Sequence, residues 1–250
     1  MLELYHTMPA SNGLKVLLCL HEKGLPFIGH PIDIFAFEQH EPWFLKINPD
    51  GQVPVLLHDG ETITESTIIN EYLDEVFPRV PLRPIEPAAT VRMRYFTKYV
   101  DEYFRPALSG IAWHHMIGKI VAKLSPEEFE AKIARIPREE KRDKWRMGAA
   151  QSSSDEQLAA WRRTLAEGVQ KMEVALERGL WLAGETYSLA DIAMFSMCTT
   201  LPRSYADIMN SDVAPLAMDW HARMMARPAV KVALATPTKR QAGPAAGQPG

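Results

Sequence analysis

A cluster of prolines divides this chain into two parts. Four prolines fall within ten residues, at Pro78, Pro81, Pro84 and Pro87. Proline lacks a backbone N–H and its ring clashes with the preceding turn, so no helix can continue through such a spacing. The sequence therefore predicts a proline-rich linker at residues 81–89, between a first domain at 1–80 and a second domain at 90–236.

The first part alternates strand and helix signals. In order along the chain they are a strand at 2–6, a helix from Ser11 to Gly24, a strand at 27–34, a polar segment around Trp43 and Phe44, strands at 53–57 and 62–64, and a helix from Glu65. Asp59-Gly60 is typical of a hairpin turn between the last two strands. This order, β-α-β-α-β-β-α, predicts a small sheet with helices on its faces.

The second part carries apolar residues at helical spacing. They are Met93, Phe96, Val100 and Phe104, and later Leu158, Trp161, Leu165, Val169, Met172 and Leu176. We therefore expect an all-helical second domain and, for the whole chain, the α+β class.

The segment 123–146 holds eight basic and six acidic side chains, which we interpret as a solvated helical excursion without chemistry. Residues 237–250, with three prolines and three glycines, are predicted to form a flexible tail.

Composition excludes several classes of function. The 28 basic and 31 acidic residues leave a net charge of −3, which disfavours a nucleic-acid partner. Cys19 and Cys198 lie far apart among apolar neighbours, so neither a disulfide framework nor a zinc site of thiolates is expected. No signal-peptide pattern opens the chain, and no run approaches the ~18 apolar residues of a membrane span. We expect a cytoplasmic protein without a metal or a membrane partner.

Several short motifs resemble those of the glutathione S-transferases. They are Gly51-Gln52-Val53-Pro54, preceded by Lys46-Ile47-Asn48-Pro49, then Glu65-Ser66, and Tyr187-Ser188-Leu189-Ala190-Asp191-Ile192. The last of them looks like the capping box and hydrophobic staple of a core helix in that family. The resemblance covers about residues 2–235. It implies a thioredoxin-like glutathione-binding domain, an all-helical second domain and a homodimer.

The resemblance implies that glutathione lies along the bend at Gln52, Val53 and Pro54. In the family the bond equivalent to Val53-Pro54 is cis, and the backbone N–H and C=O of Val53 are free to pair with an extended peptide. Glu65 would meet the ammonium of the γ-glutamyl end, and Ser66 at a helix start would meet its carboxylate. Further polar partners are expected among Lys46, Gln52, Gln39 and His40.

Ser11 and Asn12 are the candidates for activating the glutathione sulfur, because the family places that residue at the first helix N-terminus. A thiol with a pKa near ~8.5 must lose about 1.5 units to be half ionised at pH 7. A hydroxyl donor and a helix N-terminus together can supply this. We take Ser11 as the first candidate and Asn12 as the second. Cys19, two turns into the helix, is expected to be a buried, inert thiol.

Further stretches resemble the bacterial lignin β-aryl-etherases within this family. They are Phe37-Glu38-Gln39-His40 with Trp43-Phe44, Thr64-Glu65-Ser66-Thr67, Lys98-Tyr99-Val100-Asp101-Glu102-Tyr103-Phe104, and the segment from Ser125 to Glu130. This resemblance implies that a glutathione thiolate attacks the β-carbon of an α-keto β-aryl ether and expels a phenolate. Two aromatic rings need an apolar pocket, for which the candidates are Tyr103, Trp113, His114 and Ile117. A general transferase for electrophiles and a non-catalytic binding protein are the alternatives.

Overall fold

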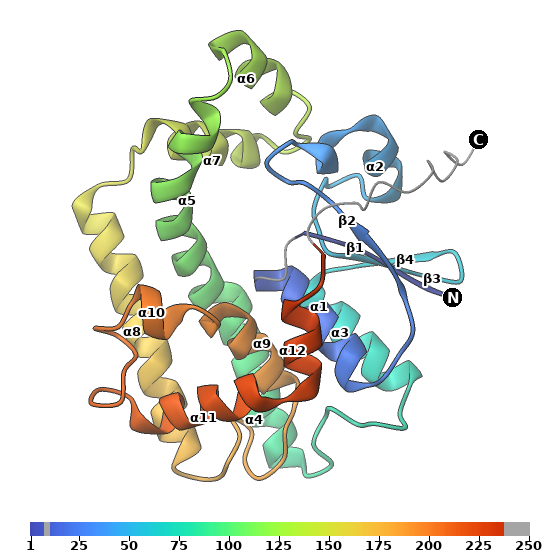
Figure 1. Cartoon of the computed structure of the whole chain (residues 1–250), viewed down its shortest axis with the longest axis vertical. Coiled ribbons are helices and arrows are strands. Elements are labelled where there is room, and N and C mark those ends of the chain that lie inside the picture. Colours follow the sequence, from blue (N-terminus) through green and yellow to red (C-terminus); the bar gives the residue numbers. More distant parts are fainter. Residues whose placement is uncertain (8–10, 238–250) are drawn as a thin grey trace.

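A four-stranded sheet and its helices form the first part of the computed structural model, which describes residues 1–7 and 11–237 (Figure 1). Its elements are β1 (Leu2–His6), α1 (Ser11–Glu22), β2 (Ile28–Pro31), a 3₁₀ turn (Glu38–His40), α2 (Pro42–Ile47), β3 (Val55–His58), β4 (Glu61–Thr64) and α3 (Ser66–Val76). The predicted order β-α-β-α-β-β-α is confirmed.

The sheet has the strand order β2-β1-β3-β4. β1 and β2 are parallel and are joined across α1, whereas β3 is antiparallel to both β1 and β4. Asp59 and Gly60 connect β3 to β4 with φ values of 51° and 92°. Two positive φ angles in a two-residue hairpin loop are what the predicted Asp-Gly turn requires.

Side chains alternate across this sheet, so both of its faces are covered. Leu4 and Leu56 join the main core with α1 and α3, while Val55 packs with Phe44 of α2 on the other face. α1 also packs against two helices of the second part, α9 (Leu189–Cys198) and α12 (Pro228–Leu234) (Figure 1). One core therefore extends through both parts of the chain.

The named elements of the second part are all helices. Besides α9 and α12 it contains α4 (Pro87–Tyr99), a π-helical turn (Val100–Phe104), α5 (Arg105–Val121), α6 (Pro126–Ile133), α7 (Glu139–Ala150), α8 (Asp155–Leu176), α10 (Leu201–Ser204) and α11 (Pro215–Ala226). α4 begins inside the stretch expected as a linker, because proline at the first helical position gives up no hydrogen bond. Of the predicted tail, residues 238–250 lie outside the described residues. No described helix is both long and apolar enough to traverse a bilayer.

The charged segment 123–146 packs more closely than predicted. It forms α6 and most of α7, which lie at the top of the view in Figure 1, near α2. Ile133 and Trp145 are buried in a small second core together with Phe37 of the first part. Ion pairs of Arg135 with Glu41 (2.7 Å) and Arg138 with Asp50 (2.9 Å) hold the same two regions together. The prediction that segment 123–146 is only a solvated helical excursion is therefore wrong in part. One face of this segment packs on the first part of the chain.

The predicted capping box at Ser188 and Asp191 is present at the start of α9. Asp191 is fully buried and accepts hydrogen bonds from the backbone N–H of Leu182 (3.0 Å) and Ser188 (2.9 Å) and from Nε1 of Trp220 (2.9 Å). A single carboxylate thus ties a loop, a helix start and α11 together in the core.

Replacing this carboxylate should destabilise the fold strongly. Asp191→Ala leaves three buried donors without their acceptor, at about 1–3 kcal/mol each, so we expect the free energy of unfolding in urea to fall by about 3 kcal/mol or more. The control is Asp219→Ala, at an exposed position beside Trp220, which should change it by less than about 0.5 kcal/mol. Similar losses for both variants would contradict this role.

Candidate functional site

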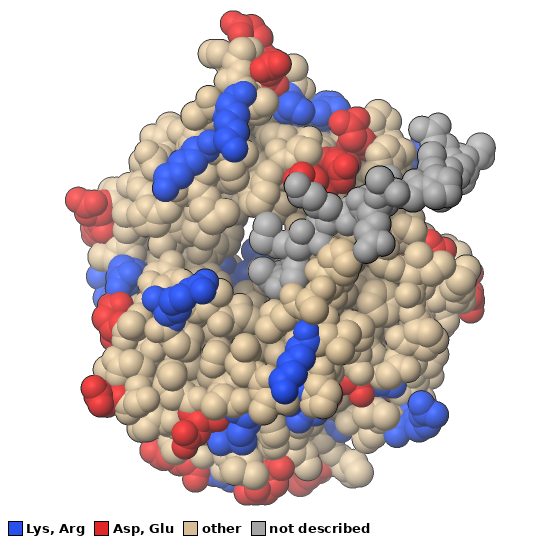
Figure 2. Space-filling view, viewed as in Figure 1, with Lys and Arg blue, Asp and Glu red and all other residues tan. Residues whose placement is uncertain are grey.

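A cavity of about 310 Å³ lies between the two parts of the chain. The first part contributes Thr7, the start of α1, residues from the segment 34–40 and the bend 51–53, and the second part contributes residues of α5 and α7. Figure 2 shows the molecule hollowed between these elements. The volume is at the lower end of the range for small-molecule sites.

The structure brings several of the predicted residues together at this cavity. Its lining includes Ser11, Asn12, Gln39, Gln52, Val53 and Trp113, and also the further candidate His40. These residues come from positions up to 102 apart in the sequence, on α1, the 3₁₀ turn, the bend before β3, and α5. The cavity therefore joins the region expected to hold glutathione to a wall of the helical part.

Ser11 and Asn12 stand at the first turn of α1 and differ in their surroundings. Ser11 has a φ of 53°, and its hydroxyl lies 3.7 Å from the Sδ atom of Met197 on α9, a weak partner. Asn12 has its Oδ1 atom buried and, among the described residues, without a hydrogen-bond partner. Both side chains remain available to a ligand at the helix N-terminus.

Unsatisfied buried polar atoms gather around this cavity. Besides Oδ1 of Asn12, they are Oε1 of Gln39 and Nδ1 of His40, which have no partner in the described part of the chain. Burial, with the nearby charge of Arg135, lowers the pKa of His40 to about 4, so its ring is neutral at pH 7. Because buried polar groups are normally hydrogen-bonded, three such atoms at one cavity are the pattern of a site for a polar ligand.

The bend before β3 has the geometry implied by the family resemblance. The Val53–Pro54 peptide bond is cis, as predicted. Gly51 has a φ of +60°, and a Cβ atom there would come within 3.1 Å of both the Gln39 carbonyl oxygen and Nδ1 of His40. A glycine is therefore required for the bend to lie against these two residues. Asn48 fixes the bend further by donating to the Gln52 carbonyl oxygen (2.9 Å).

Four other residues predicted for the glutathione site lie outside the cavity lining. Lys46 is exposed on α2, and Glu65 is exposed immediately before α3. Ser66 is buried at the first position of α3, with only 3% of its surface exposed. Pro54 is also buried, behind the bend. The start of α3 is thus a separate polar position.

A buried lysine missed by the sequence reasoning organises that position. Lys15 of α1 is fully buried, and its Nζ atom donates to Ser66 Oγ (3.4 Å), Thr67 Oγ1 (3.2 Å) and the carboxylate of Asp101. Thr67 in turn donates to the other Asp101 oxygen (2.6 Å). Burial lowers the pKa of Lys15, and Asp101 opposes that shift. A charged group this deep is tolerated because it is paired and hydrogen-bonded.

Asp101 reaches this network from the π-helical turn between α4 and α5. π-helical turns inside α-helices are rare and frequently occur at functional sites. Here the turn supplies the only carboxylate that pairs with Lys15 in the described part of the chain. The start of α3 is therefore held from two sides, by α1 of the first part and by the α4–α5 junction of the second.

Of the four residues predicted for the aromatic pocket, only Trp113 lines the cavity. Tyr103 is 55% exposed and stacks on Tyr99 elsewhere on the helical part. His114 packs its ring against His115. Ile117 shares a helix face with Trp113 but is buried under α7, where a Cβ on Gly148 would lie 3.0 Å from it. Helical spacing predicted the shared face correctly and could not predict where α7 covers it.

The remaining wall of the cavity comes from residues that sequence reasoning assigned no role. Arg105 and Ser109 of α5 and Lys141, Lys144 and Trp145 of α7 all line it. The spacing of the three α7 residues, i, i+3 and i+4, places them on one helix face, and that pattern could have been found in the sequence. The charged segment therefore carries one wall of the site.

Lys144 has the most defined position in this wall. Its Nζ atom donates to Ser109 Oγ (3.0 Å) and lies 4.6 Å from the centre of the Trp113 ring. Burial, together with the charges of Arg105 and Lys141, lowers the pKa of Lys144 to about 8. The site thus combines an aromatic surface with a cation that releases its proton more readily than an exposed lysine.

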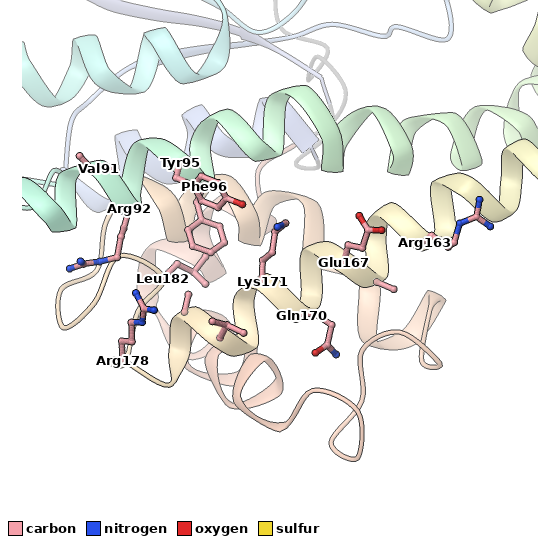
Figure 3. A pocket seen from close by; sticks show the side chains of 13 residues that line it. Val91, Arg92, Tyr95, Phe96, Arg163, Glu167, Gln170, Lys171, Arg178 and Leu182 are labelled. Atoms are coloured by element: carbon pink, nitrogen blue, oxygen red, sulfur yellow. The ribbon is translucent and has the colours of Figure 1, made fainter.

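A larger groove, of about 910 Å³, lies between α4 and α8. Figure 3 shows Tyr95 and Phe96 of α4 facing Lys171 of α8 across it, with Arg92 and Arg178 at one end. Its lining includes no residue of the first part and none of the predicted site residues. We therefore do not assign the predicted glutathione site to this groove.

Both cysteines are buried and free, and burial raises the pKa of each thiol, which confirms the interpretation of Cys19 as inert. Within residues 1–7 and 11–237, no three or more histidine, cysteine, aspartate or glutamate side chains come together in a group that could hold a metal ion.

Comparison with known proteins identifies the class to which this fold and site belong. Residues 11–76 match the glutathione S-transferase N-terminal domain model, and residues 111–228 match the C-terminal domain model. The chain belongs to the glutathione S-transferase family.

Individual relatives refine this placement. The chain is 43% identical over 239 residues to Protein LigF of Sphingobium sp. (strain NBRC 103272 / SYK-6), covering 92% of this chain and 91% of that protein. The crystal structure of Beta-etherase LigF from Sphingobium sp. strain SYK-6 is similar with a TM-score of 0.89 and 42% identity, over 93% of this chain and 98% of that one. A glutathione transferase homologue from Sulfitobacter, solved with bound glutathione, has a TM-score of 0.66 and 27% identity, over 93% and 96% of the two chains.

The Lys15 network should matter for glutathione binding as well as for stability. In Lys15→Met, Ser66 and Thr67 lose a charged hydrogen-bond partner worth about 1.5 kcal/mol or more, so we expect titration calorimetry to show glutathione binding weakened roughly tenfold. Lys23→Met is the matched control, because Lys23, immediately after α1, is also buried but pairs with Asp74 (2.7 Å). It should destabilise the fold and leave glutathione binding within about twofold. Equal weakening in both would exclude a local effect at Ser66.

Proposed function

We propose that this protein is a glutathione-dependent β-etherase. In this reaction the glutathione thiolate attacks the β-carbon of an α-keto β-aryl ether, releasing a phenol and leaving a glutathionyl ketone. The observation that carries the proposal is the 43% identity, over nearly the whole chain, to a protein whose solved structure is titled a Beta-etherase. The cavity supports it, because one end carries the polar features of a glutathione site and the other carries two tryptophans.

We place glutathione along the bend before β3. The backbone of Val53 lies at the cavity, where it can pair with an extended peptide in strand fashion. The unsatisfied atoms of Gln39 and His40, with Gln52, are the partners nearest to the bend. The γ-glutamyl end would reach Glu65 and Ser66 at the start of α3, which the Lys15 network holds in place. Lys46 is exposed outside the cavity lining, as Glu65 is, and stays a candidate partner for the rest of glutathione.

The glutathione sulfur would then face the first turn of α1. Asn12 offers a side-chain amide whose Nδ2–H group can donate to an anion, while the Ser11 hydroxyl already donates to the thioether of Met197. We therefore favour Asn12 over Ser11 as the principal donor to the thiolate. The helix N-terminus adds a partial positive charge at the same place.

The aromatic substrate would occupy the wall formed by α5 and α7. Trp113 and Trp145 line this wall, and Leu108 adds aliphatic surface to it. Large rigid rings at this wall suit a substrate with two aryl groups. Glutathione is consumed in this scheme, so it is a cosubstrate. We expect the enzyme to work in the cytoplasm, where glutathione is kept reduced.

We also infer a homodimer, in which the first part of one copy packs on the second part of another. The groove between α4 and α8 supports this, since its sides expose Val91, Tyr95 and Val174 at the surface. α3 of the first part exposes Ile68 and Val76, at 58% and 43%. Exposed apolar surfaces of this kind on a folded chain mark sites of association.

The proposed activity is tested by incubation with glutathione and each enantiomer of an α-keto β-aryl ether. We expect a phenol and a glutathionyl ketone in equal amounts, followed by chromatography and mass spectrometry. An unrelated chlorodinitrobenzene-type electrophile serves as the comparison substrate. Turnover of that electrophile without any ether cleavage would show a general transferase, and no turnover of either would leave only glutathione binding.

The thiolate assignment predicts different effects for two neighbouring variants. In Asn12→Ala the ultraviolet absorbance of the bound thiolate at neutral pH should fall by more than half, because losing a hydrogen bond to a charged group costs about 1.5–3 kcal/mol and raises the thiol pKa by about 1–2 units. Ser11→Ala should reduce it by a smaller amount. The reverse order of effects would return the role to Ser11, and no change in either would assign it to the backbone of α1.

A further inference from the structure

Lys144 is held in the cavity wall by two contacts of its ammonium group. One is a hydrogen bond to Ser109, and the other is a cation–π contact with the Trp113 ring. We propose that its ammonium group receives the oxygen of the leaving phenolate and protonates it during ether cleavage. This inference deepens the proposed β-etherase function and rests on it. Under this proposal Lys144, on α7 of the second part, is the catalytic acid, and Asn12, on α1 of the first part, holds the thiolate on the other side of the cavity.

The contacts of Lys144 aim its charge at an aryl group bound in the cavity. Ser109 Oγ accepts a hydrogen bond from Nζ at 3.0 Å, and the centre of the Trp113 ring lies 4.6 Å from the same Nζ atom. These two contacts hold the long side chain against α5, along the wall that also includes Trp145. A substrate ring stacked at these tryptophans would bring its ether oxygen to the same wall. The remaining N–H groups of the ammonium have no acceptor among the described residues.

The charged side chains around Lys144 in the cavity lining are all positive. Arg105 of α5 and Lys141 of α7 face the same cavity, and the described lining contains no aspartate or glutamate. No carboxylate of the described residues lies within ion-pair distance of Lys144. By contrast, the buried lysines Lys15 and Lys23 each pair with an aspartate. Three cations without a counter-charge are an arrangement that stabilises negative charge formed during a reaction.

The chemistry of the step follows from this geometry. As the thiolate sulfur bonds to the β-carbon, the bond from that carbon to the ether oxygen breaks, and its electron pair passes to the oxygen. The phenolate so formed takes a proton from Nζ of Lys144, giving a phenol and a neutral amine. The hydroxyl of Ser109 then donates to the amine, which regains its proton from water after the phenol leaves.

The proton affinities suit this transfer. A phenol has a pKa near ~10, while the environment of Lys144 lowers the pKa of that group to about 8. The proton is therefore held about 100-fold more tightly by the product phenolate than by the amine. At neutral pH the amine still begins each cycle protonated.

The other polar residues of the cavity are less suited to this role. The His40 ring is neutral at pH 7, its pKa being about 4, and it lies against Gly51 at the bend assigned to glutathione. Arg105 contributes charge, but a guanidinium keeps its protons. His114 and Tyr103, which the sequence suggested for the aromatic pocket, lie outside the cavity lining.

The test compares two α-keto β-aryl ethers that differ only in the leaving phenol, one releasing a nitrophenol and the other a methoxyphenol. Lys144→Met should lower kcat for the methoxyphenol ether by about 100-fold, a typical effect of losing a general acid. For the nitrophenol ether the loss should stay below roughly tenfold, because nitrophenolate leaves readily without a proton. The absorbance of the bound glutathione thiolate should not change.

Three further variants separate this role from a structural one. Lys132→Met is the matched control: Lys132 lies 5.6 Å from the Phe37 ring, on α6 of the same segment, and outside the cavity lining, so both ethers should react as in the unaltered protein. Lys144→Gln retains a donor to Ser109 and should show the same selective loss as Lys144→Met with an unchanged melting temperature. Lys144→Arg should recover only part of the methoxyphenol rate, because it restores the charge alone.

Equal losses on the two ethers in Lys144→Met and Lys144→Gln would overturn the inference while leaving the proposed function intact. Full recovery by Lys144→Arg would overturn the proton transfer. Failure of the unaltered protein to cleave either ether would overturn the proposed function itself, and this inference with it. A larger loss on the methoxyphenol ether than on the nitrophenol ether supports the assignment.

Discussion

The burial of α1 is the constraint on which the rest of this structure depends. Every residue from Gly13 to Leu20 is buried, because the helix packs on the sheet with α3 and, on its other side, on α9 and α12. A helix with apolar residues on nearly all sides is stable only in the interior of a protein. The first turn of α1 is consequently fixed where the two parts of the chain meet, and Ser11 and Asn12 are presented to the cavity from a rigid base. Such rigidity is what a thiolate site requires, since misplaced donors lose their effect.

The same burial explains why Lys15 and Asp101 occur together. An ammonium in the middle of a buried helix has a large desolvation cost, which here is offset by a carboxylate from the π-helical turn and by two hydroxyls at the start of α3. The pair links the two parts of the chain at the position proposed for the γ-glutamyl group. Binding and the association of the parts are therefore coupled through one charged contact.

Local signals predicted the first part well and the second part less completely. The Asp59-Gly60 hairpin, the Ser188–Asp191 capping box and the strand at 2–6 are set by residues close in sequence, and each is present. The bend at Val53–Pro54 was predicted through the family resemblance. By contrast, the places of Tyr103 and Ile117 depend on where α7 and α8 lie, and that is decided by packing between distant segments. Lys15 was missed because a lysine in an apolar helix gives no sign of its partner 86 positions away.

The charged segment 123–146 shows why composition alone gives a wrong prediction when the helical spacing of the residues is not considered. Its fourteen charges suggested a solvated surface, and most of them are indeed exposed or half-buried. Lys141, Lys144 and Trp145 nevertheless share one face, and Trp145 is buried against Phe37, which turns that face toward the cavity. Charge on the outer face keeps α7 in contact with water, while the inner face provides a cationic and aromatic wall. In a protein of net charge −3, a cavity whose described lining holds three cations and no carboxylate reflects the needs of the site, and α5 and α7 are the helices that supply them.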